Sequence, residues 1–291
     1  MINVAFCADD KYVVPASVLI ESLLEHNDGS DVAFYTVAND LSAGTREKFN
    51  RIVTGYGSTI HYIEMPNDIL NVISEYKIGV SYISRAAFYR LLLPYLLDSD
   101  IQRLLYLDCD ILIQGDIQPL FDTDLDGKTI AGVLDFSSTL FAERLHIDNY
   151  INSGVLLIDV DRWKSLYPME EILNAIKKLY MERELQQGDQ DIINLLFEGS
   201  IKCVSDKFNF QRHISKSFSW HHKELVKKAV IVHFITGRKP WTYAYCYPYT
   251  RAYYAYWKQY ITTKTKMKYW VFKPIAVVKN WLCVGRKGSK K

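Results

Sequence analysis

Two aspartates separated by one residue, Asp108 and Asp110, directly follow a short apolar stretch at 104–107. Carboxylates placed together at the end of a buried strand repel each other, and a bound divalent cation would relieve that repulsion. Such a cation could in turn hold a pyrophosphate. An Asp-x-Asp triplet also occurs in solvated turns. The apolar stretch before it favours the metal site.

A third candidate ligand, His233, follows another apolar stretch at 229–232. A histidine in a strand is more often a packed core residue than a ligand. The segment after it contains Gly237, Arg238 and Lys239, and a glycine turn with two cations can wrap a pyrophosphate. The alternative is a solvated loop. Two carboxylates and an imidazole would suit Mn²⁺ better than Mg²⁺, which prefers oxygen ligands.

Two further acidic motifs lie where they could serve a nucleotide site. Asp9 and Asp10 end the first apolar stretch, and Asp189 opens an amphipathic segment after Gly188. A role as helix N-cap explains Asp189 fully, and that role is compatible with a catalytic one. The sequence has no glycine-rich phosphate loop of the dinucleotide or Walker type. A bound nucleotide would therefore depend on a cation to neutralise its phosphates.

The elements that position these residues follow from the apolar pattern. Strands are expected at 2–8, 31–37, 59–63, 103–107, 129–134, 155–158 and 229–233. Helices are expected from about Pro15, from a cap at Ser42 to about residue 56, at 84–92 with Pro94 stopping the helix, and at 169–183 and 189–197. This alternation predicts an α/β fold with a mostly parallel sheet. Ligands bind such sheets at the carboxyl ends of strands, where 8–10, 108–110 and 233 fall.

The composition is that of an ordinary globular protein, with 49% hydrophobic and 23% charged residues among 291. No window approaches the roughly 20 uninterrupted apolar residues of a membrane-spanning helix, and no signal-peptide pattern is visible. The five cysteines show no zinc spacing. We expect them to be reduced, which fits a cytoplasmic location.

Charge is distributed unevenly along the chain. No acid follows Glu224, and residues 225–291 contain 15 Lys and Arg. Residues 262–291 mix nine of these cations with Trp, Phe and aliphatic side chains, a composition typical of a segment in a membrane interface. We therefore expect one domain at 1–261 and a basic membrane-association tail at 262–291. A solvated tail is the alternative, and nothing else in the chain favours nucleic acid.

In this order the motifs resemble those of the family 8 glycosyltransferases, a retaining group that includes bacterial lipopolysaccharide galactosyl- and glucosyltransferases and, more distantly, glycogenin. The resemblance covers about residues 2–260 and depends on the segments 6–10, 84–91, 105–110, 152–157, 188–191 and 233–241. It implies a Rossmann-like GT-A fold that moves galactose or glucose from a UDP-hexose to a glycan or glycolipid acceptor. With the tail, it suggests a cytoplasmic enzyme attached peripherally to the inner face of the cell membrane.

The resemblance also implies roles by position. Uridine and ribose would contact Cys7 through its backbone, Ala8, Asp9 and Tyr12. Mn²⁺, or Mg²⁺ as a weaker substitute, would bind Asp108, Asp110 and His233, with Cys109 between the carboxylates. The phosphates and donor sugar would contact Arg90, Asp135, Asn152, Gly154, Gly237 and Lys239, and Asp189 with Gln190 would lie near the anomeric carbon. The family glycine usually stands three residues after the histidine, where this chain has Thr236 and places Gly237 next.

Two other classes share part of this pattern. A phosphatase of the haloacid dehalogenase type also has a strand followed by Asp-x-Asp, but its nucleophile normally lies on the first strand. That class also leaves His233 and Lys239 unexplained. A non-catalytic nucleotide-sugar-binding protein would be expected to lack metal ligands, and all the candidates are present here.

Overall fold

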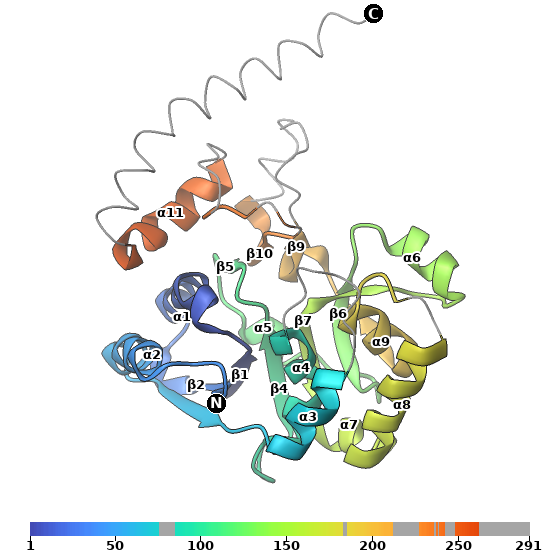
Figure 1. Cartoon of the computed structure of the whole chain (residues 1–291). Helices are drawn as coiled ribbons and strands as arrows, with labels where there is room; N and C mark the ends of the chain where they lie inside the picture. Colours follow the sequence, from blue (N-terminus) through green and yellow to red (C-terminus); the bar gives the residue numbers. More distant parts are fainter. Residues whose placement is uncertain are drawn as a thin grey trace, which may run out of the picture.

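A computed structural model of the chain describes residues 1–75, 85–182, 185–211, 227–235, 237, 239–241 and 248–261 (Figure 1). The tail expected at 262–291 lies outside these residues. Within them, no helix is both long and apolar enough to cross a membrane.

The centre of the molecule is a seven-stranded sheet with the order β3-β2-β1-β4-β7-β6-β8. Its strands are β1 (Ile2–Phe6), β2 (Val32–Val37), β3 (Thr59–Ile63), β4 (Arg103–Leu107), β6 (Ile130–Leu134), β7 (Ile151–Asp159) and β8 (Ile201–Cys203). Strand β7 is antiparallel to β4 and β6, and every other neighbouring pair is parallel. The predicted α/β fold with a mostly parallel sheet is confirmed.

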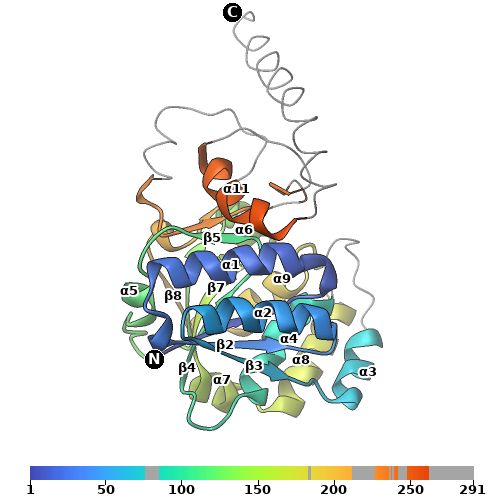
Figure 2. The same ribbon diagram turned by 90° about the vertical axis from the view of Figure 1, so that its left-hand side faces the viewer.

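Helices cover both faces of this sheet (Figures 1 and 2). The α-helices of the described residues are α1 (Val13–His26), α2 (Ala43–Gly55), α3 (Asn67–Glu75), α4 (Arg85–Leu96), α5 (Gln118–Phe121), α6 (Ser138–Leu145), α7 (Val160–Leu166), α8 (Met169–Glu182), α9 (Asp189–Leu196) and α11 (Pro248–Tyr260). Apolar side chains of α1, α2 and α5 form the core on one face, and those of α3, α4, α7, α8 and α9 form the core on the other. Burial of these apolar surfaces is the main stabilising contribution.

A second, three-stranded sheet contains β5 (Ile111–Ile113), β10 (Ile231–His233) and β9 (Phe210–Gln211) in that order. The expectation that His233 ends a strand of the main parallel sheet is therefore wrong. The turn after β4 directs the chain out of the main sheet into β5, and β10 pairs antiparallel with β5, His233 opposite Ile111. A third apolar cluster joins this sheet to α1 and α11.

Three local predictions can be compared with the structure. Ser42 caps α2 as expected, its hydroxyl accepting from the backbone N–H of Thr45 at 3.4 Å. Pro94 does not stop α4, which continues to Leu96, because one missing backbone hydrogen bond is outweighed by buried neighbours such as Leu92 and Leu93. The strand expected at 155–158 begins earlier, at Ile151, because β7 also pairs with the end of β6.

Candidate active site

The carboxyl end of β4 and the first half of β7 meet at one edge of the main sheet. Because β7 is antiparallel to β4, residues before Val155 lie beside those that follow Leu107. The backbone N–H of Asp108 donates to the carbonyl of Gly154 at 2.8 Å. The direction of one strand thus brings the segment 152–154 to the Asp-x-Asp turn.

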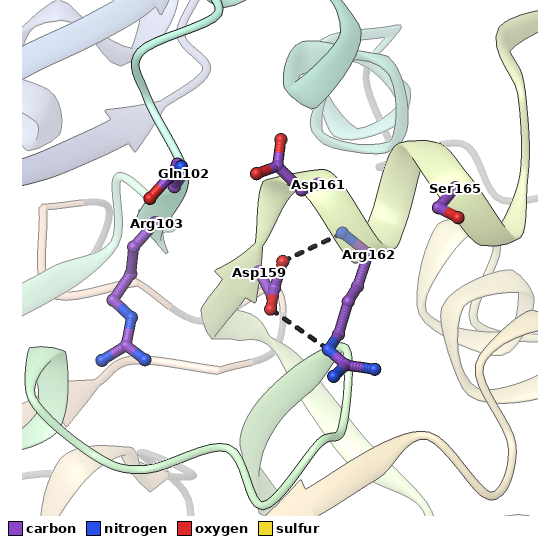
Figure 3. Close-up of a pocket in the computed structure, with 6 residues that line it drawn as sticks. All are labelled: Gln102, Arg103, Asp159, Asp161, Arg162 and Ser165. Atoms are coloured by element: carbon purple, nitrogen blue, oxygen red, sulfur yellow. Dashed lines mark hydrogen bonds and ion pairs between the residues drawn. The ribbon is translucent and has the colours of Figure 1, made fainter.

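A pocket at the opposite edge of the sheet is a separate feature (Figure 3). It is lined by Gln102, Arg103, Asp159, Asp161, Arg162 and Ser165. Arg103 begins β4 and pairs with Asp159 at the end of β7. The Asp159 carboxylate caps α7 through the backbone N–H of Arg162 at 2.9 Å. Asp159 and Arg162 in this pocket thus serve to cap α7, and the candidate site residues lie at the other edge of the sheet.

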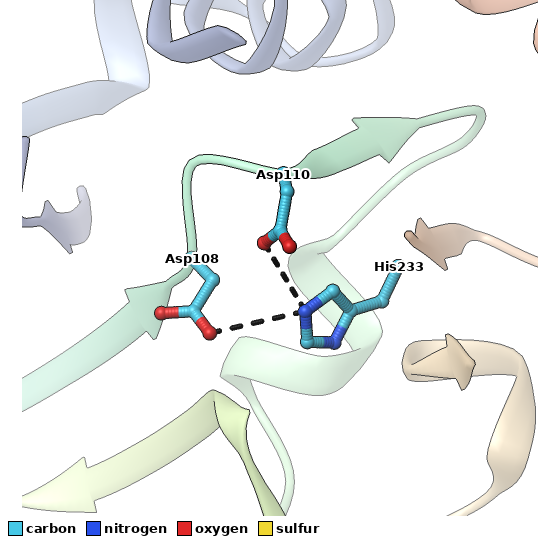
Figure 4. Close-up of side chains that lie close together, drawn as sticks. All are labelled: Asp108, Asp110 and His233. Atoms are coloured by element: carbon cyan, nitrogen blue, oxygen red, sulfur yellow. Dashed lines mark ion pairs between the residues drawn. The ribbon is translucent and has the colours of Figure 1, made fainter. Parts of the chain in front are cut away.

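Asp108, Asp110 and His233 converge, as the sequence suggests (Figure 4). One potential ligand atom from each lies within 4.8 Å of the others. His233 Nε2 is 3.2 Å from Asp110 Oδ1 and 3.8 Å from Asp108 Oδ2. Pairing of β10 with β5 brings the histidine in, and the backbone N–H of Phe234 also donates to the Asp110 carbonyl at 3.0 Å.

These groups fit a divalent cation, and Gly154 keeps the space they need. A Cβ at this position would lie 2.3 Å from His233 Cε1 and 2.7 Å from Asp108 Oδ2. Any other residue here would push the imidazole and the carboxylate apart. Two carboxylates and one imidazole around a position without a side chain form a donor set that can hold a divalent cation.

Lys239 adds a positive charge to this cluster. Its ammonium forms an ion pair with Asp110 and donates to the Phe234 carbonyl at 2.7 Å. Burial by itself would raise the pKa of Asp110, but the net shift is downward, chiefly because of the Lys239 ammonium, so the carboxylate stays ionised. The next residues are held in place because the Tyr254 hydroxyl donates to the Pro240 carbonyl at 2.7 Å.

Arg90, on α4, links Asp108 of the candidate metal site to Asp189. Its guanidinium is 3.0 Å from Asp108 Oδ1 and 2.9 Å from Asp189 Oδ2, and it donates to the Ser153 carbonyl at 2.7 Å. The side chain is 7% exposed. Burial opposes its charge, but the two carboxylates outweigh this and raise the pKa of Arg90. Its contact with a donor stays a prediction, while its protein partners give it a structural role that the sequence did not reveal.

The interpretation of Asp189 as a helix N-cap is wrong. Gly188, with φ of 58°, precedes α9, and the Asp189 side chain turns to Arg90 instead. Only glycine adopts that backbone region readily. Burial raises the pKa of Asp189 to about 6, although Arg90 acts in the opposite direction. The neighbouring Asp191 accepts from the backbone before the helix, at Gln186 and Gln187 N–H.

A hydrogen-bonded group next to the candidate metal site contains Asp135, Asn152 and Gln190. Asn152 Nδ2 donates to Asp135 Oδ2 and to Gln190 Oε1, both at 3.1 Å. Gln190 Nε2 donates to Asp135 Oδ2 at 3.2 Å, and its Oε1 accepts from the backbone N–H of Ser153 at 3.0 Å. Asp135 directly follows β6, Asn152 lies on β7 and Gln190 lies on α9, so only tertiary packing joins them.

The residues expected at the nucleoside follow β1. The thiol of Cys109 donates to the Cys7 carbonyl at 3.2 Å, and burial raises the pKa of the Cys7 thiol to about 12. Asp9 Oδ1 accepts from the backbone N–H groups of Lys11 and Tyr12 at 2.9 and 3.1 Å. Ala8 is buried. The Cys7 side chain is therefore inert, which leaves a backbone role open to it.

Tyr12 and Gly237 complete the predicted set. The Tyr12 ring meets Trp241 edge-on with centroids 6.0 Å apart, so the segment after β1 reaches the one after β10. Gly237 is exposed, and a Cβ there would meet no atom within 4 Å. Asn209 is a residue that sequence reasoning missed. It contacts His233 and Asn152, and its position between two phenylalanines carries no recognisable motif.

The amino-acid sequence is similar to those of several bacterial proteins. General stress protein A of Bacillus subtilis is 27% identical over 269 residues, covering 88% of this chain and 93% of the relative. A lipopolysaccharide 1,2-glucosyltransferase of Escherichia coli is 27% identical, covering 82% and 73%, and GlyF of Streptococcus pneumoniae is 29% identical, covering 82% and 57%.

The fold is that of the galactosyltransferase LgtC, solved in complex with donor and acceptor sugar analogues. The TM-score is 0.74 at 21% identity, over 92% of this chain and 100% of that one. The sequence model of glycosyl transferase family 8 matches residues 3–244. That match extends from β1 through the Asp-x-Asp turn and His233 to the Lys239 segment. The chain therefore belongs to glycosyl transferase family 8 and is a glycosyltransferase.

Proposed function

We propose that the protein is a metal-dependent, retaining hexosyltransferase that moves galactose or glucose from a UDP-sugar to a glycan or glycolipid acceptor. The observation that carries the proposal is the convergence of Asp108, Asp110 and His233 around Gly154. An acceptor in lipopolysaccharide or another cell-surface glycoconjugate is supported by the names of the Escherichia coli relatives.

The side chains of the site would divide the work between leaving group and sugar. A divalent cation bound by the three ligands would neutralise the departing diphosphate as a Lewis acid. Lys239, which contacts Asp110, would add its charge to the same phosphates. On the sugar side, the carboxylate of Asp135 would accept from sugar hydroxyls, and Gln190, whose amide is fixed by Asn152 and Ser153, would face the anomeric carbon beside Asp189.

The proposal predicts that sugar transfer stops when divalent cations are removed. In a panel of nucleotide sugars we expect consumption of UDP-galactose or UDP-glucose with Mn²⁺, weaker consumption with Mg²⁺, and none in excess chelator. Product analysis should show retained anomeric configuration. Full turnover in chelator would refute the metal role. Hydrolysis of a generic phosphate ester without sugar transfer would favour the phosphatase class instead.

We also propose that residues 262–291 attach the enzyme peripherally to the inner face of the cell membrane. The support is compositional: nine cations and no acid, each worth about 1 kcal/mol near an anionic leaflet before screening. Truncation after Ile261 leaves α11 intact, with Trp257 buried and Tyr256 bonded to Glu25 at 2.5 Å. The truncated protein should lose binding to anionic vesicles yet keep turnover on a soluble acceptor. Equal sedimentation of both proteins with vesicles at physiological salt would contradict the attachment.

A further inference from the structure

We propose that Asn209 is a positioning residue that fixes the tautomer of His233, with the proton on Nδ1 and the Nε2 lone pair turned toward Asp108 and Asp110. The inference rests on the proposed metal-dependent function. It assigns to this chain a residue outside the ligand set that prepares the histidine to bind a cation.

The argument begins at Asn152, whose amide can have only one orientation. The backbone N–H of Gly154 donates to Asn152 Oδ1 at 3.1 Å, and a backbone N–H is never an acceptor. On its other side, Asn152 Nδ2 lies 3.1 Å from Asp135 Oδ2, and an ionised carboxylate only accepts. A donor at one end and an acceptor at the other independently require the same placement of oxygen and nitrogen.

The orientation of Asn209 follows from that of Asn152. The side chain that lies 2.9 Å from Asn152 Oδ1 must present its NH₂ group. The carbonyl oxygen of Asn209 is then the atom 3.0 Å from His233 Nδ1. Asn209 is 1% exposed and His233 is 4% exposed, so water has little access to exchange these bonds.

Because Asn209 Oδ1 can only accept, His233 Nδ1 must carry a hydrogen. In the neutral imidazole the lone pair is then on Nε2, the atom 3.2 Å from Asp110 Oδ1 and 3.8 Å from Asp108 Oδ2. A lone pair on Nδ1 would instead face the carbonyl oxygen of Asn209 at 3.0 Å, and two acceptors at that distance repel each other. A chain of hydrogen bonds that starts at a backbone amide of β7 therefore prepares the histidine of β10 as a cation ligand.

The same chain joins the metal ligands to the group expected at the sugar. Asn152 contacts Asp135 and Gln190 through its other end, so Asn209 supports both halves of the site. A substitution that only loosened the fold would lower stability without changing which imidazole nitrogen carries the proton. The tautomer is therefore the readout that distinguishes positioning from a general structural role.

The test is nitrogen-15 NMR of histidine-labelled, metal-free protein at a pH where the imidazole is neutral, with His233 assigned by His233→Gln. We expect Nδ1 protonation in the wild type and loss of that preference in Asn209→Leu. Asn209→Asp should restore the preference in part, because a carboxylate also accepts from Nδ1–H but cannot donate to Asn152 Oδ1 as Asn209 does. Mn²⁺ affinity in the presence of UDP, measured by electron paramagnetic resonance, should fall about 10- to 100-fold in Asn209→Leu and partly recover in Asn209→Asp.

Asn3→Leu is the matched control, since Asn3 donates to the Arg103 carbonyl at the opposite edge of the sheet. It should leave the His233 tautomer and Mn²⁺ affinity unchanged. A wild type without a proton on Nδ1 would overturn the inference, and that spectrum decides even if Asn209→Leu fails to fold. An unchanged tautomer in a folded Asn209→Leu would also overturn it. A wild type with the expected tautomer that binds no Mn²⁺ would refute the proposed function and leave the role of Asn209 standing.

Discussion

Gly154→Ala should abolish sugar transfer while the protein stays folded. The added Cβ would come within 2.3 Å of His233 Cε1 and 2.7 Å of Asp108 Oδ2, and both side chains are held from behind by Asn209 and Arg90. The added methyl group would therefore force the side chains of His233 and Asp108 apart. We expect Mn²⁺ affinity to fall by at least about 100-fold. Transfer should drop to the level of Asp110→Ala, a variant that removes one ligand outright.

Gly132→Ala is the matched control in the neighbouring strand. Its Cβ would also meet a close atom, at 2.6 Å, but that atom is the terminal methyl of Ile151, which can rotate away. Both variants should show a small loss of thermal stability, and only Gly154→Ala should lose Mn²⁺ binding by electron paramagnetic resonance. Near-normal Mn²⁺ affinity in Gly154→Ala would show that the cation binds elsewhere.

Arg90→Met should destabilise the metal-free protein by about 3–5 kcal/mol, because it leaves the buried Asp189 and the partly buried Asp108 without their cation. The guanidinium contacts Asp108 at 3.0 Å and Asp189 at 2.9 Å with only 7% exposure. Methionine fills much of the volume, so the loss reports charge and hydrogen bonding more than packing. Urea unfolding in chelator measures the effect.

A second substitution separates the ion pair from other contributions. Asp189→Asn added to Arg90→Met should restore part of the lost stability, since it removes one of the two unpaired charges. The separate variant Arg90→Lys should still be less stable than the wild type, because an ammonium cannot reach Asp108, Asp189 and Ser153 together. A loss below about 1 kcal/mol for Arg90→Met would mean that the carboxylates find another partner or bind protons.

Local sequence determined the elements and several of their ends. Apolar periodicity located the parallel strands and their crossover helices, and Ser42 could be identified as a cap because capping involves residues a few positions apart. The Asp-x-Asp motif and its preceding apolar stretch indicated the candidate metal site, again because these residues are neighbours in the sequence. Local rules fail at Pro94 and Asp189. Packing allows α4 to continue past the proline. The Asp189 carboxylate, which could have capped α9, forms an ion pair with Arg90 instead.

Tertiary structure decided which of these residues meet. The antiparallel direction of β7 brings Asn152 and Gly154 to the end of β4, and pairing of β10 with β5 carries His233 to Asp110. Asn209 lies 24 residues from His233 and Arg90 lies 63 from Ser153, so no short-range pattern could link them. Residue types and spacing specify the chemistry available, whereas strand direction and packing determine the distances at which that chemistry can operate.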